Sequence, residues 1–149
     1  MKAFSLELTP DESVAKIGKS HTHILWSLGH LLWSYEVATG AAIGLVPQIP
    51  ASYTSLFAFS GAPTDNAADY PSVAELTAQV EASAKRLAEK IASLSDADLA
   101  QPLPAAHPLA PFFPNIDALL AMMPFHTGYH VGQIGLLRRA LGLPGVMMG

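Results

Sequence analysis

Apolar side chains recur at the spacing of a helix in three long stretches of this chain. The first runs from His21 to Thr39, and its apolar positions are Leu25, Leu28, Leu32 and Tyr35. A repeat of three or four residues places these side chains on one face of a helix. Ser20 is a good N-cap and Gly40 a plausible stop, so the sequence predicts one helix between them.

The second and third stretches also carry start signals. Ser72 and Glu75 match a capping box, and the amphipathic helix that they open is expected to end near Ser93. Asn115 can cap the third helix, which is expected to run to about Leu141.

Proline-rich segments separate these helices. Residues 41–71 hold four prolines, so we expect no long helix there. The segment also contains Leu56, Phe57 and Phe59, and we expect it to lie across the bundle and close something. Short helical turns are expected near residues 10–13 and 95–98, and no alternating strand pattern is visible. The prediction is therefore an all-α helical bundle, with a single domain over residues 1–149 and more than half of the chain helical.

Composition adds an expectation about assembly. Half of the 149 residues are apolar and only 13% are charged, against roughly 25% in an average domain. We expect some apolar surface to be covered by a partner, most simply in a homodimer. The net charge is −4 and no basic cluster exceeds two residues, which argues against binding to nucleic acid.

The chain has no cysteine, so it supplies neither a disulfide nor a thiolate. Its first residues lack the apolar stretch of a signal peptide, and no run approaches the roughly 18–20 apolar residues of a membrane span. The default expectation is a cytoplasmic protein.

Histidines carry the candidate chemistry. His126 and His130 are four residues apart on the last predicted helix, so they share a face, roughly 6 Å apart along the axis. His30 lies in the middle of the first, strongly apolar helix. A single histidine there is more often a hydrogen-bonded core residue, but three converging imidazoles are difficult to satisfy without a shared ion. Three protein ligands with an open fourth position are the pattern of a catalytic zinc site, so we predict one divalent metal ion on these histidines.

Four other residues are weaker candidates. His23 shares a face with His30 and is a possible lining of the same cavity, supporting the metal ligands. Gln133 follows on the face of His130 and is a possible ligand partner or substrate contact, or else it satisfies a polar group of the core. His21 is expected to be exposed and His107 to be solvated in its proline-rich loop.

Two motifs resemble a known family. Residues 23–30 (HILWSLGH) resemble the H-x-x-W-x-x-G-H segment of the DinB-like (DinB/YfiT) superfamily. Residues 126–134 (HTGYHVGQI), followed by LRRALG at 137–142, resemble that family's ending. The likeness covers about residues 20–145, and the two motifs in this order and spacing are fairly specific.

This resemblance implies a four-helix bundle whose buried metal is held by residues that map onto His30, His126 and His130. Members with known activity tend to be transferases or isomerases that use low-molecular-weight thiols, such as bacillithiol transferases and mycothiol-dependent maleylpyruvate isomerase. The implied function is a metal-dependent, small-thiol-dependent S-transferase.

Two departures from the family pattern stand out. The stretch before Ser20 is shorter than a full-length first helix, so we expect that helix to be short or incomplete. Pro124 falls two residues before His126. Either the last helix begins later than Asn115, or it kinks at the proline and aims His126.

Alternative functions stay open at this point. One is a hydrolase that uses metal-bound hydroxide, a second is a non-enzymatic metal- or ligand-binding dimer, and a third is a structural bundle with histidines in its core. Imidazole ligands suit several metals, of which zinc or nickel is favoured. No residue stands out as an obligatory general base, and the catalytic residues and the substrate are not assigned.

Overall fold

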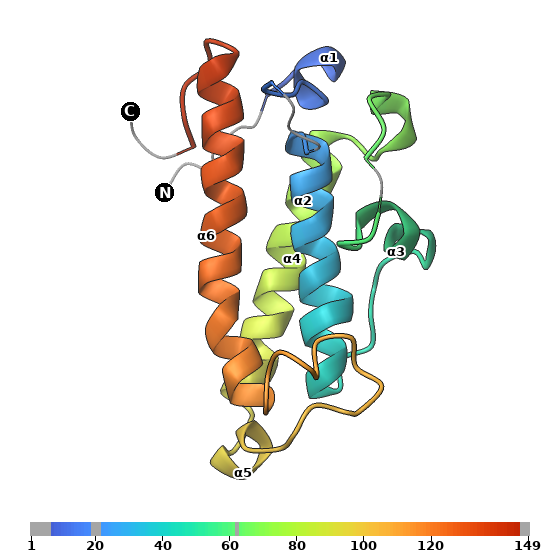
Figure 1. Cartoon of the computed structure of the whole chain (residues 1–149). Coiled ribbons are helices and arrows are strands. Elements are labelled where there is room, and N and C mark those ends of the chain that lie inside the picture. Colours follow the sequence, from blue (N-terminus) through green and yellow to red (C-terminus); the bar gives the residue numbers. More distant parts are fainter. Residues whose placement is uncertain (1–6, 19–21, 62, 147–149) are drawn as a thin grey trace.

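The computed structural model describes residues 7–18, 22–61 and 63–146, and its regular elements are helices joined by loops (Figure 1). More than half of the described residues are helical and none is in a strand, which confirms the predicted all-α class. The long elements are α2 (Ile24–Trp33) with its extension, α4 (Val73–Ala92) and α6 (Ile116–Ala140). Short helices connect them: α1 (Pro10–Ser13), α3 (Ser52–Phe57), the 3₁₀ turn η3 (Ala67–Asp69) and α5 (Asp96–Leu99).

Helix α2 is the centre of the bundle. It packs against α4, α6 and α3, and all ten of its residues are buried (Figure 1). Because α2 is covered on every side, it is apolar all round rather than striped. The first helix is the single turn α1, closed by a capping box between Thr9 and Glu12. This confirms the expected short first helix: within the described part of the chain, three long helices and this single turn make up the bundle.

The start of α2 differs from the prediction. Helix α2 begins at Ile24, and its cap is His23, whose Nδ1 accepts a hydrogen bond from the Trp26 amide at 3.1 Å. Ser20, the predicted cap, and His21 lie outside the described residues. An extended backbone at His23 places its ring over the first turn, where a side-chain acceptor satisfies an otherwise free helix N–H.

The predicted stop at Gly40 is wrong, because the helix continues through it. Residues Ser34–Gly40 form the π-helix η1, and a 3₁₀ turn η2 (Ala41–Ile43) leads to Gly44, whose positive φ of 79° ends the helix. A Cβ on Gly40 would lie 2.6 Å from the Tyr35 carbonyl oxygen, so the wide turn requires glycine at that position. Sequence spacing alone does not distinguish a glycine that ends a helix from one that lets it widen.

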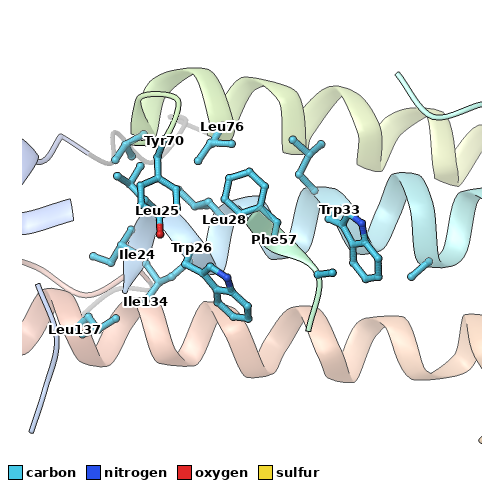
Figure 2. Close-up of a cluster of buried hydrophobic side chains, with 14 residues drawn as sticks. Ile24, Leu25, Trp26, Leu28, Trp33, Phe57, Tyr70, Leu76, Ile134 and Leu137 are labelled. Carbon is cyan, nitrogen blue, oxygen red and sulfur yellow. The ribbon is translucent and has the colours of Figure 1, made fainter. Parts of the chain in front are cut away.

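The apolar segment between α2 and α4 folds back onto the bundle, as predicted. Figure 2 shows Phe57, at the end of α3, inserted among side chains of α2 and α4. The Phe57 side chain is fully buried. This loop therefore contributes to the main hydrophobic cluster and lies against the helix that carries His30.

The last two long helices agree with their predicted start signals. Ser72 and Glu75 form a capping box at α4, and the Asn115 side chain accepts from the Ala118 amide at α6. Helix α6 is continuous across Pro124, so the alternative of a later start is wrong. Within the described residues, no helix is both long and apolar enough to cross a membrane.

Candidate metal centre

Three histidines from the two facing helices α2 and α6 meet in the bundle. One ring nitrogen from each of His30, His126 and His130 lies within 4.8 Å of the other two, and the Nε2 atoms of His30 and His126 are 3.3 Å apart. Two nitrogens bound at about 2.1 Å to one tetrahedral ion are roughly 3.4 Å apart. The structure thus brings together the three residues that the sequence predicted, at a separation that fits one metal ion.

The His30 ring is held by a backbone carbonyl. Its Nδ1 lies 2.7 Å from the oxygen of Phe57, and because a carbonyl only accepts, the Nδ1–H donates. Nε2 then carries the free lone pair, on the side facing His126. A hydrogen bond from the second ring nitrogen to a carbonyl is the usual support of a histidine metal ligand.

Gly29 makes this contact possible. A Cβ on Gly29 would lie 2.0 Å from an atom of the Phe57 ring, so only glycine lets Phe57 pack directly onto α2. Phe57 was not among the site residues predicted from the sequence. Two features of the sequence pointed to its role: the glycine before His30 and the unusual apolarity of the loop.

Burial keeps the imidazoles neutral. It lowers the pKa of His126 and of His130 to about 4, and the proximity of His30 adds to this effect. The nearby Gln133 side chain acts in the opposite direction on His130. Burial also lowers the pKa of His30, against the hydrogen bond to Phe57. Neutral imidazole is the form that binds a metal.

Two nitrogens of the cluster have no protein partner. Nδ1 of His126 and Nδ1 of His130 are buried, and no described residue hydrogen-bonds to them. Leaving a buried polar atom unpaired costs about 1–3 kcal/mol. The unpaired nitrogens argue against a self-sufficient polar core. The donor set that fits a divalent ion is the group of three neutral imidazoles, with one nitrogen from each ring within 4.8 Å of the others.

A family-wide sequence profile supports the same conclusion. The profile described as the DinB superfamily matches residues 5–134 of this chain. The chain belongs to the DinB superfamily. Neither the curated proteins nor the solved structures contain a significant match to it. Family membership and the three-histidine group together fit a metal-dependent enzyme.

In this DinB superfamily member, aromatic rings fix the ligands further. Trp26 stacks on His30 at 4.7 Å between ring centroids, and Trp33 lies at 6.1 Å. On the other helix, the hydroxyl groups of Thr127 and Tyr35 are 2.8 Å apart, which ties the turn that follows His126 to η1. The two tryptophans are one helical turn either side of His30, whereas the contact between Tyr35 and Thr127 joins residues far apart in the sequence, which local spacing does not reveal.

Of the weaker candidates, Gln133 lies at the metal centre and His23 does not. Gln133 lies beside His130; its Nε2 donates to the Tyr129 hydroxyl at 3.1 Å, and its Oε1 is buried without a partner among the described residues. His23 instead contacts the loop before α4, where its Nε2 lies 3.0 Å from the Thr64 carbonyl. The structure therefore brings His23 to the helix start and not to the other three histidines.

The expectation that His107 is solvated is wrong. Its ring is half-buried, and Nε2 donates to the Ala38 carbonyl at 2.8 Å. Ala38 belongs to the π-helix η1. His107 thus ties the loop before α6 to the end of the first long helix.

An apolar cavity of about 230 Å³ opens onto His30 and His126. It lies between η1 and the first half of α6, and its walls are Trp33, Phe59, Leu109, Leu119, Met122 and Met123. Among the described residues that line it, none is an acid, a lysine or an arginine. The cluster of histidines is therefore accessible from an apolar space within the molecule.

Proposed function

We propose that this DinB superfamily protein is a metal-dependent S-transferase that joins a small external thiol to an electrophile. The observation that carries the proposal is the convergence of three neutral imidazoles, two of which, His30 and His126, line an apolar cavity. His30, His126 and His130 would hold the ion, with zinc or nickel favoured for a set of imidazole ligands.

A divalent ion with three neutral ligands retains its charge and lowers the pKa of a thiol or water at its remaining position. The protein's own contribution is to keep the ligands neutral and correctly oriented. Burial lowers the histidine pKa values, and Phe57 holds the proton of His30 on Nδ1, away from His126. The apolar walls would hold the apolar part of the electrophile beside His30 and His126.

The thiol has to come from solution, because the chain has no cysteine. In the proposed reaction the thiol gives its proton to solvent, and its sulfur attacks a carbon of the electrophile. The leaving group departs with the electron pair of the bond that breaks. A water molecule in place of the thiol would give hydrolysis, which is the runner-up function.

The test uses chlorodinitrobenzene or an epoxide as the electrophile, with physiological thiols offered one at a time. Metal-loaded wild-type protein is compared with His126→Ala and with His107→Ala, which removes a histidine outside the cluster. We expect thiol-dependent product from the wild type and from His107→Ala, and at most a residual rate from His126→Ala.

Each outcome has a distinct meaning. Equal consumption of the electrophile without thiol supports the hydrolase. No metal-dependent turnover across the panel contradicts the transferase for these substrates and favours a metal- or ligand-binding protein. Metal analysis of the same samples separates a lost ion from a lost reaction.

A further inference from the structure

The cavity beside the histidines is lined from two sides. His30 and His126 belong to its lining, together with Thr39 of η1 and Leu119 of α6. His126 and Leu119 are seven residues apart on one helix, which corresponds to about 10 Å along the axis. A ligand that fills the cavity therefore extends away from the histidines along α6.

We propose that this cavity binds the apolar body of the electrophile, a group about the size of one substituted aromatic ring, with its reactive atom toward His30 and His126. The inference rests on the proposed function for the identity of the reactive end. The binding of an apolar ring by the cavity is independent of that function and is tested separately.

Size limits the occupant. A dry apolar cavity of about 150 Å³ accepts benzene, and pockets for drug-sized ligands range from roughly 300 to 1,000 Å³. The cavity of about 230 Å³ lies between these limits. One ring with a short substituent fills this space. The cavity is open to solvent beside the exposed ring of Phe59, so any larger part of a ligand has to lie outside it.

Polarity limits the occupant further. A charged ligand group would enter a space with no ionic partner among the described lining residues, which is strongly unfavourable. The Thr39 hydroxyl does not change this, because Thr39 is fully buried and its Oγ1 donates to the Met123 sulfur at 3.0 Å. The preferred ligand is therefore uncharged and apolar.

The experiment measures binding of benzyl alcohol, benzoate and benzylammonium by ligand-observed NMR titration. It uses the protein as purified and again after removal of metal with EDTA. For the metal-free protein we expect benzyl alcohol to bind at least about tenfold more tightly than either charged analogue, a difference of roughly 1.4 kcal/mol. Binding that survives metal removal tests the cavity alone, whatever the outcome of the transferase assay.

Ala38→Leu is the decisive variant, because Ala38 is buried and lines the cavity away from the histidines. Added side-chain atoms there occupy ligand space, and we expect benzyl alcohol affinity to fall about tenfold. Ala121→Leu makes the same change on the exposed face of α6, outside the cavity, and is expected to leave the affinity unchanged. Met122→Trp fills the cavity from its other wall if Ala38→Leu does not fold.

Unchanged benzyl alcohol binding in a folded cavity-filling variant would overturn the inference. Equal affinity for the three probes would also overturn it, as would the absence of benzyl alcohol binding to the wild type. Melting curves of each variant establish that the bundle is intact.

Discussion

The ring of Phe57 rests directly on Gly29, where an added Cβ would lie 2.0 Å from the ring carbon Cε1. This contact positions the Phe57 carbonyl oxygen 2.7 Å from Nδ1 of His30. The glycine therefore serves the candidate metal centre from a position that binds nothing itself. It explains in physical terms why a glycine precedes the histidine in an otherwise apolar helix.

Gly29→Ala is expected to destabilise the protein and to weaken its hold on metal. The methyl group forces Phe57 away, at a cost of about 1–3 kcal/mol for overpacking. Urea unfolding followed by circular dichroism measures this change. The matched control is Gly132→Ala on α6, where a Cβ meets no neighbour within 4 Å. Replacing a glycine by alanine within a helix should raise the free energy of unfolding by about 0.5–1 kcal/mol. Equal effects of the two variants would contradict the account.

The pH dependence of stability follows from the histidine pKa values. Burial lowers the pKa of His126 and His130 from 6.5 to about 4 in the folded protein. Between these values the unfolded chain binds more protons than the folded one, so the unfolding free energy of the metal-free protein rises with pH in that window. The stability that the neutral histidines contribute is present above about pH 6.5 and is lost as the pH falls toward 4.

Urea titrations at about pH 5 and at neutral pH test this sign, since the lower value lies within the window. His126→Gln removes one of the two groups and should flatten the dependence. Wild-type stability that is equal at both pH values, or higher at the acidic one, would contradict the assigned pKa directions.

The π-helix is supported by a buried ion pair. The carboxylate of Glu36, only 3% exposed, lies 3.0 Å from the Arg86 guanidinium and also accepts from the Gln48 amide. Arg86→Met is expected to lower the free energy of unfolding by about 2–3 kcal/mol. Breaking a fully buried pair costs about 3–5 kcal/mol, and the loss is smaller here because Arg86 is partly exposed. Adding Glu36→Gln should restore most of this loss. A double variant less stable than Arg86→Met would show that the carboxylate does not depend on the arginine.

Local patterns in the sequence predicted much of the fold. The capping box at Ser72 and the cap at Asn115 are encoded within a few residues, and both helices begin where predicted. The gathering of His30 with His126 and His130 also followed from helical period and burial. The π-helix, the capping role of His23 and the Phe57 contact depend on packing between distant segments, which the spacing of residues does not contain.

Homodimer formation remains a prediction. The exposed face of α6 carries Phe125, Tyr129 and Leu136, all more than half exposed, and the first helix is only one turn. We expect a second copy of this chain to cover that face, and sedimentation at micromolar concentration to give a dimer. Leu136→Glu should produce monomers, while Val46→Glu, at an exposed position beside Arg86 of α4, should not. A monomeric wild type would contradict the prediction.

The metal content of the purified protein shows whether His30, His126 and His130 hold an ion. Protein produced without a polyhistidine tag is analysed by mass spectrometry for zinc, nickel, copper and iron, as wild type and as His30→Ala, His126→Ala and His130→Ala. His107→Ala and His23→Asn serve as controls, because both histidines bond elsewhere in the bundle. The account predicts close to one ion per chain in the wild type and both controls, with loss of tight binding in each of the three ligand variants. A folded wild-type protein that binds no divalent ion tightly, or an ion that stays in His30→Ala and leaves in His107→Ala, would contradict it.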